Sequence, residues 1–313
     1  MTPQNNRAMA KSATAQGRAA AIASSITAAS RDASLLDHEK EFRASDDDAL
    51  FEQNLNSSNN SEEDPNLSAD VTAKSTTMNE LATPYHYVPL EMGGNGRTHK
   101  STVASTALIQ EIGGLPTLER MTTHFYSNAF LDSTLDNFIR SHGDPHAKRF
   151  SRWIHQKLTG SSVWDEERAS RSARPVTVAS GHTIVVHDRS SAHVAAWHSP
   201  KRPDHEVGRH FKLDECRVWM RLHFWAMRVI VGDSSPSFTD YYIRFIGHFI
   251  SVYEGTAPTF ARDSARWSAD QKNTQEYIDN GRTMNDVLGL SLGQALSQIP
   301  QDEADDTYWP YEM

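Results

Sequence analysis

The stretch that most constrains this chain is residues 111–126, which contain two adjacent glycines and end in an aromatic pair, Phe125-Tyr126. After the glycines, apolar residues recur every three or four positions: Leu118, Met121, Phe125 and Ala129. That spacing puts them on one face of a helix. Tyr126 adds one hydroxyl to this otherwise apolar surface. The stretch therefore predicts a helix over about residues 116–130 whose apolar face is buried.

The same spacing predicts three more helices further along the chain. One opens at Asp144-Pro145 and stops at Gly160, the next follows Asp214 as its cap and ends before Gly232, and the last covers residues 241–253. Residues 161–190 break the periodicity and allow at most a short strand at 183–186. A weak helix follows near residues 190–198. The short connections between long amphipathic helices indicate an all-α domain.

Apolar residues are spread unevenly over the chain, which sets the expected domain boundaries. Only 38% of the residues are hydrophobic and the mean hydropathy is -0.60. Residues 1–100 contain no Trp and few aromatic residues, so this part lacks the apolar surface that folding requires. We expect a disordered N-terminal extension over residues 1–100, a folded domain over 101–256 with an insertion loop at 161–190, and a polar, disordered C-terminal tail over 257–313.

Charge and cysteine content narrow the classes of partner and compartment. The net charge of -9 disfavours nucleic acid as a partner, and no apolar run reaches the ~20 residues of a membrane helix. The single cysteine, Cys216, cannot form an internal disulfide and fits a reducing compartment such as the cytoplasm. Residues 1–31 carry Arg and Ser but no acidic residue, which is also compatible with a transit peptide for a plastid or mitochondrion.

Several aromatic and polar residues follow the Gly-Gly helix in a recognisable order. A short polar turn ends in an aromatic residue, a histidine begins the next helix with an aromatic residue one turn later, and a tryptophan lies on the penultimate helix. Together with the Phe-Tyr pair, these elements resemble the truncated haemoglobins, and the tryptophan resembles the group II branch. The resemblance covers about residues 111–254. It implies a truncated globin-like helical sandwich that binds haem b through five residues: Tyr126, Phe138, His146, Phe150 and Trp219.

The resemblance also implies a proximal histidine that binds the haem iron. His198, Arg202 and His205 keep the mutual spacing of the group II pattern, which makes His205 the first candidate. His210 is the rival, because it keeps an arginine directly before the histidine, although it lies four residues too close to Trp219. We expect one of these two histidines to be the metal ligand.

What the resemblance implies about function is a haem protein that reversibly binds dioxygen or another diatomic gas. The donors and polarity of the distal pocket decide what happens to the gas, and donors aimed at developing negative charge stabilise it. Tyr126, His146 and Trp219 would supply three donors, which favours tight binding or nitric oxide dioxygenation. Whether a reductase is a partner is left open by the sequence. The alternative is a haem-free globin fold that serves as an interaction or scaffold module.

The remaining histidines have less specific interpretations. Five of them lie between residues 187 and 210 and invite a metal-site interpretation: His187, His193, His198, His205 and His210. They lack the His-Glu-x-x-His and Cys-His spacings of zinc sites, so we do not expect zinc. His223 and His248 fall within apolar helices and are predicted to be core histidines with satisfied nitrogens.

Overall fold

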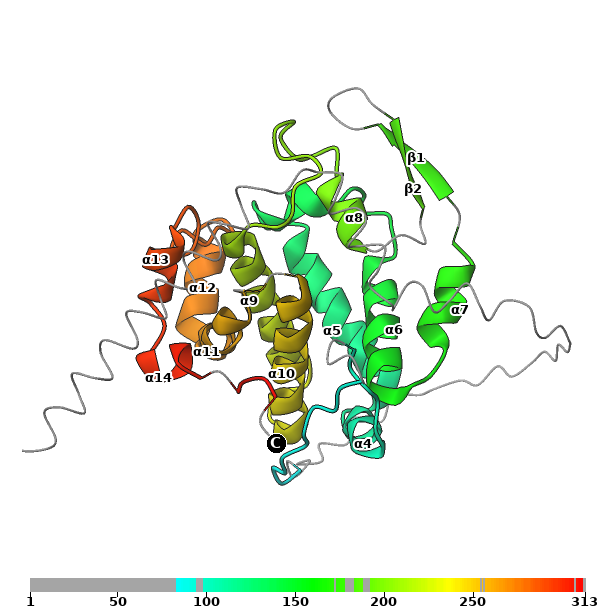
Figure 1. The fold of residues 1–313 in the computed structure, drawn as a ribbon, viewed down its shortest axis with the longest axis vertical. Coiled ribbons are helices and arrows are strands. Elements are labelled where there is room, and N and C mark those ends of the chain that lie inside the picture. Colours follow the sequence, from blue (N-terminus) through cyan, green and yellow to red (C-terminus); the bar gives the residue numbers. More distant parts are fainter. Residues whose placement is uncertain are drawn as a thin grey trace, which may run out of the picture. The chain divides into compact units, whose positions relative to one another are not determined.

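The structure, a computed structural model, describes residues 83–93, 98–171, 173–177, 183–187, 192–253, 255, 257–306 and 308–311. The prediction of a transit peptide at residues 1–31 lies outside them. The described part is mainly helical, which confirms the expected helical class (Figure 1). Its elements are α4 (Val103–Glu111), α5 (Gly114–Ala129), η1 (Leu135–Phe138), α6 (His146–Thr159), α7 (Val163–Ala169), β1 (Ala173–Thr177), β2 (Thr183–His187), α8 (Ala192–Trp197), α9 (Leu213–Ile230), α10 (Pro236–Tyr253), η2 (Ala257–Phe260), α11 (Ala261–Ala269), α12 (Gln271–Asp279), α13 (Leu292–Leu296) and α14 (Gln301–Ala304).

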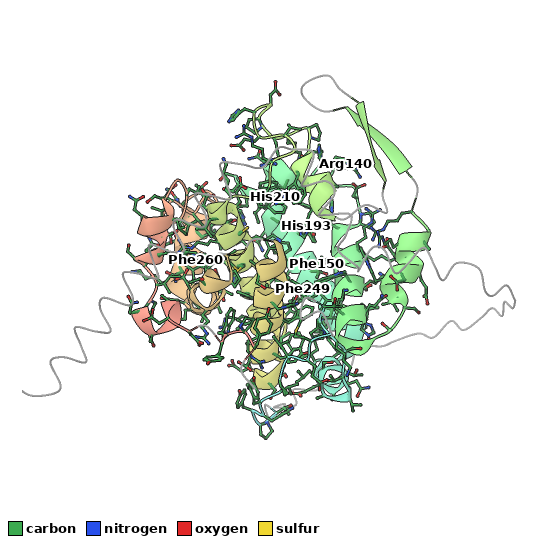
Figure 2. The ribbon with its side chains drawn as sticks, in the orientation of Figure 1. Arg140, Phe150, His193, His210, Phe249 and Phe260 are labelled. Carbon is green, nitrogen blue, oxygen red and sulfur yellow. The ribbon has the colours of Figure 1, made fainter. Side chains whose placement is uncertain are left out.

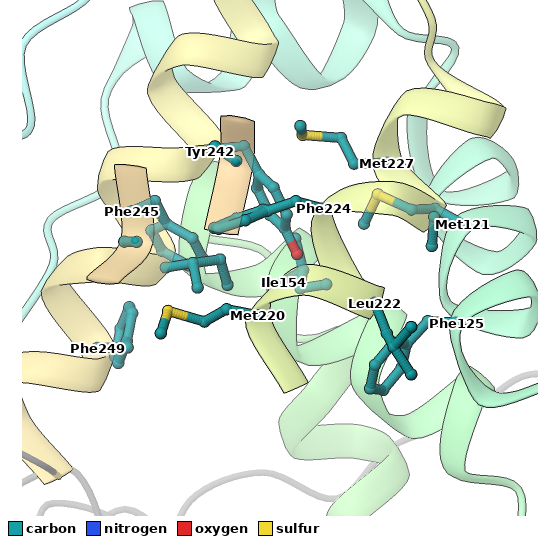
Figure 3. Packing of buried hydrophobic residues seen from close by; sticks show 14 of the residues in the cluster. Met121, Phe125, Ile154, Met220, Leu222, Phe224, Met227, Tyr242, Phe245 and Phe249 are labelled. Atoms are coloured by element: carbon teal, nitrogen blue, oxygen red, sulfur yellow. The ribbon is translucent and has the colours of Figure 1, made fainter. Parts of the chain in front are cut away.

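Four long helices, α5, α6, α9 and α10, form the core. Helix α5 packs on both α6 and α9 (Figure 1). Each helix contributes large side chains that are almost fully buried, including Phe125 of α5, Ile154 of α6, Phe224 of α9 and Phe245 of α10 (Figure 3). Burying such side chains is the main favourable term in folding. Within the described ranges, no helix combines the length and apolar character that crossing a membrane requires.

The Gly-Gly pair sets the start of α5. Gly113 and Gly114 have φ angles of +88° and +74°, in the left-handed region that residues with a Cβ rarely adopt. A Cβ on Gly113 would also lie 3.0 Å from the Thr117 hydroxyl oxygen. The structure therefore confirms a helix after the glycines, with its first residue at Gly114 instead of near residue 116.

Helices α6 and α9 also form where the sequence predicts them, but the cap of α9 differs. Helix α6 ends at Gly160, whose φ is +72° and whose Cβ would approach the Ser101 hydroxyl to 2.7 Å. At the start of α9, the Glu215 carboxylate accepts a hydrogen bond of 2.6 Å from the Lys212 backbone N–H. Helix α9 begins at Leu213 with Lys212 as its N-cap, so the prediction of Asp214 as the cap is wrong. The Asp214 carboxylate accepts hydrogen bonds from the backbone N–H groups of Glu215 and Gly289.

The insertion at residues 161–190 contains regular structure. It holds α7 and an antiparallel hairpin of β1 and β2, in which Ala173 pairs with His187 and Thr177 with Thr183. The short strand expected at 183–186 therefore exists as part of β2. The weak helix expected near 190–198 is α8.

The expected boundary at residue 100 is wrong, because the segment before α4 joins the core. Val88 and Leu90 are 4% and 7% exposed, and His99 is 5% exposed. The Arg244 guanidinium donates a hydrogen bond of 2.9 Å to the Val88 carbonyl, which ties the segment to α10. This stretch is too short and extended to show a helical period, so its apolar residues carried no clear signal in the sequence.

The expected disordered C-terminal tail is also wrong. Residues 257–306 form η2 and α11–α14, and α11 packs against α9. Several of their apolar side chains are buried: Phe260, Ala261, Tyr277, Val287 and Ile299. These helices are short, so few apolar residues in each suffice to attach it. A low apolar content therefore did not mean absence of fold here.

Candidate functional site

Tyr126 lies in the last turn of α5, on the side that faces α6. Its ring centroid is 5.0 Å from that of Phe125 and 5.2 Å from that of His146. Burial raises the pKa of its hydroxyl above the ordinary value, so the phenol is neutral. Among the residues that the structure describes, none forms a hydrogen bond with this hydroxyl. The group is therefore a donor available to a ligand.

His146 is the first residue of α6 and stacks on the Tyr126 ring. Its Nε2–H donates a hydrogen bond of 2.8 Å to the Ser141 carbonyl, which fixes the ring against the preceding turn. Burial lowers the pKa of the imidazole, opposed in part by the Ser141 carbonyl and by Asp144. The histidine is therefore neutral near pH 7 and lies beside Tyr126, as the sequence predicted.

Trp219 reaches the same region from α9. Its ring centroid is 5.6 Å from Phe125 and 6.0 Å from Phe150 of α6, and its ring is nearly parallel to His223, at 4.7 Å and 12°. The indole is partly exposed, and within the described chain no acceptor is bonded to its N–H. Helices α5, α6 and α9 thus bring four of the five predicted pocket residues together. We call Phe125, Tyr126, His146, Phe150, Trp219 and His223 the aromatic cluster.

The aromatic cluster adjoins an open pocket at the molecular surface. Tyr126 and His146 also line this pocket, which has a volume of about 500 Å³ and lies between α5 and the start of α6. Phe130, Lys148 and Arg152 form other parts of its wall. The neutral hydroxyl and imidazole therefore stand between the solvent and the apolar rings behind them. Such an arrangement suits entry of a small ligand from this side.

Phe138, the fifth predicted pocket residue, lies in a second group of rings around α8. Its centroid is 4.9 Å from that of Phe211, and the Arg202 guanidinium lies 4.7 Å from its centroid. Trp197 and His193 of α8 pack on the same Phe211 ring, at 6.0 and 5.6 Å. The ring contacts of Phe138 therefore connect it to the α8 group and not to the aromatic cluster.

The two histidines expected to bind a metal lie at the surface. The His205 side chain is 75% exposed, and its Nε2 is 3.7 Å from a Glu206 carboxylate oxygen. His210 is exposed as well and stacks on Trp197 with centroids 4.2 Å apart. Neither of them, nor His193 of α8, has a ring contact with the aromatic cluster among the described residues. The side chains of His205 and His210 both face solvent in this structure.

His193 was not singled out as an iron ligand in the sequence, but it has the more suitable surroundings. It lies on α8, and its ring contacts those of Trp197 and Phe211. His193 and His210 are labelled in Figure 2. Burial, and to a lesser extent the charge of His210, lower its pKa to about 4. A neutral imidazole is the form that binds iron. The sequence signal was a histidine inside the weak helix, but the group II spacing pointed to His205.

No group of three His, Cys, Asp or Glu side chains able to hold a metal ion occurs within the described ranges. The chain matches no protein-family model, and no curated protein or solved structure matches it significantly. The functional assignment therefore depends on the residues of the chain itself and on their arrangement.

Proposed function

We propose that residues 101–256 form a haem-binding, globin-like domain that binds dioxygen or another diatomic gas. The observation that carries the proposal is the pair of unused donors in the aromatic cluster. The Tyr126 hydroxyl and the Trp219 indole N–H belong to α5 and α9, and both rings contact Phe125. Buried polar groups are normally hydrogen bonded within a protein. Two partly exposed donors beside apolar rings are typical of a site that receives a polar ligand.

The residues present fit haem in two respects. The macrocycle needs apolar walls, which Phe125 and Phe150 provide. It needs a neutral imidazole on one side, and His193 on α8 meets this requirement best. When bound, haem would supply the iron that coordinates the gas. The chain's own contribution would be to donate hydrogen bonds from Tyr126 and Trp219 and to keep water away from the site.

Nitric oxide dioxygenation with a separate reductase is the finer form of this proposal. The Tyr126 hydroxyl and the Trp219 N–H would be two donors to one gas molecule and would slow its release, which suits reaction of the bound gas better than rapid delivery. The N–H of His146 is already donated to the Ser141 carbonyl. Tyr126 and His146 also adjoin the open pocket, so a second small reactant has an entry route.

Haem binding is tested by adding haemin to the purified full chain. We expect a Soret band near about 400–430 nm, the region of His-ligated haem. His193→Ala should lose most of the haem, because the imidazole–iron bond is the main directional attachment, whereas His205→Ala and His210→Ala should keep it. Haem loss in one of those two controls instead would transfer the ligand role to that residue. If the wild-type chain gave no Soret band, the haem-free interaction module would replace this proposal.

A further inference from the structure

His223 lies one helical turn beyond Trp219 on α9, and it is fully buried. Its ring is parallel to the Trp219 indole and also contacts Phe125 and Phe150, with centroids 5.1 and 5.2 Å away. It therefore touches three rings of the aromatic cluster. Trp219 is partly exposed whereas His223 is not, so His223 lies behind Trp219 as seen from the site.

One nitrogen of His223 has a partner and the other does not. Its Nε2 is 2.7 Å from the hydroxyl oxygen of Tyr242 on α10, which is also fully buried. Its Nδ1 is buried without a hydrogen-bond partner within the described part of the chain. A donated hydrogen bond from the Tyr242 hydroxyl to Nε2 leaves only one N–H unsatisfied, which is the less costly arrangement.

An imidazole at this position is not needed for packing. A phenylalanine, although somewhat larger, would pack among the same rings without an unsatisfied buried nitrogen. What the imidazole adds is a directional bond to α10, because the Tyr242 hydroxyl fixes the plane of the His223 ring. Because the Trp219 indole stacks nearly parallel to the His223 ring, fixing the plane of His223 also restricts the plane of the indole.

We propose that His223, held by Tyr242, is a positioning residue that fixes the orientation of the Trp219 indole N–H in the candidate gas site. The functional part rests on the haem-binding function proposed above. The orientation of Trp219 itself does not depend on haem, so the two can be tested separately.

A second buried tyrosine–histidine pair supplies a matched control. Tyr241, the neighbour of Tyr242 on α10, is also fully buried, and its hydroxyl is 2.5 Å from Nε2 of His99. Tyr242→Phe and Tyr241→Phe each remove one buried hydroxyl bonded to a histidine. Their costs in stability should therefore be similar, while only Tyr242 is linked to Trp219.

The first measurement follows the Trp219 side chain in the full-length chain labelled with 5-fluorotryptophan. The fluorine resonance of Trp219 is identified by its loss in Trp219→Phe. We expect Tyr242→Phe and His223→Phe to shift or broaden this resonance, and Tyr241→Phe to leave it unchanged. An unchanged Trp219 resonance in Tyr242→Phe, or an equal change in both tyrosine variants, would overturn the proposal whether or not the protein binds haem.

The second measurement uses the haem-loaded chain. Tyr242→Phe should speed dioxygen release by about two- to tenfold, in the lower part of the range for residues coupled through shared contacts. In a Trp219→Phe background it should have no further effect, because the indole through which it acts is gone. An undiminished effect in that background would show that Tyr242 does not act through Trp219 and would refute the positioning role.

Discussion

Helix α9 carries two pairs of residues at four-residue spacing, Arg217 with Arg221 and Trp219 with His223. The arginine pair faces the C-terminal helices, where the Arg217 guanidinium is 2.9 Å from Asp263 and lies over the Phe260 ring. The aromatic pair faces α5, α6 and α10 and includes an indole N–H that has no acceptor among the residues that the structure describes. One helix thus attaches the C-terminal segment with one side and builds the candidate site with the other.

The two sides of α9 differ in how their polar groups are satisfied. Arg217 and Arg221 are nearly fully buried, but each charge is compensated by a carboxylate, Asp263 or Asp286. Trp219 carries no charge, yet its donor is left for something outside the described chain. Compensated charge indicates a fixed contact, and an unused donor beside apolar rings indicates a place for a ligand.

The largest expected effect is the loss of stability when the ion pair between Arg217 and Asp263 is removed. Asp263→Ala removes the carboxylate that pairs with Arg217, whose side chain is 1% exposed. The buried charge then keeps its hydrogen bond to the neutral Gln298 amide oxygen but loses its compensating charge. We expect the free energy of unfolding to fall by about 3–5 kcal/mol, measured by urea denaturation. Glu303→Ala, which breaks the exposed pair with Arg266, is the control and should cost less than about 1 kcal/mol. Equal losses in the two variants would show that burial of Arg217 does not matter.

The next largest effect is a decrease in folding stability at low pH, caused by the buried histidines. Burial lowers the pKa of His223 to about 3 and that of His99 to about 4, below the ~6.5 of an unfolded chain. The unfolded state binds more protons below about pH 6.5, so stability is complete above that value and falls as the pH decreases towards 4. Each histidine should cost about 2 kcal/mol between pH 6.5 and pH 5.

Thermal or urea unfolding of the haem-free chain at several pH values measures this dependence. His223→Phe should remove about half of the loss that these two histidines cause, because the phenyl ring does not titrate. Arginine stays charged throughout this range, so the arginine side should add no pH dependence of its own. A variant with the full wild-type pH dependence would contradict the assignment to His223.

The smallest expected effect tests the unused donors of the aromatic side. Tyr126→Phe removes only the hydroxyl and should speed dioxygen release by at least about tenfold, since a hydrogen bond to a charged acceptor contributes roughly 1.5–3 kcal/mol. Trp219→Phe should act in the same direction, and the double variant should be non-additive because both donors share one acceptor. Stopped-flow kinetics measure the rates. Wild-type rates in both single variants would remove these residues from the gas site.

Much of the candidate site was predictable from local pattern. The apolar period around Phe125 and Phe150 set the faces of α5 and α6. That Tyr126 and His146 lie near each other was implied by the resemblance to truncated haemoglobins and not by the period. The role of the histidines around α8 was not predictable in this way. Loops of irregular length separate His193, His205 and His210, and sequence spacing does not report which of them turns inward and which meets solvent.

By itself, the sequence determined the helical class, the glycine-dependent start of α5 and which residues line the faces of the long helices, because these depend on backbone conformation and periodicity. Only the tertiary structure decided that residues 257–306 join the fold, that His205 is exposed and that His223 meets Tyr242. Each of these depends on contacts between segments far apart in the chain. Burial and hydrogen bonding at such contacts are properties of the assembled core, and no local pattern encodes them.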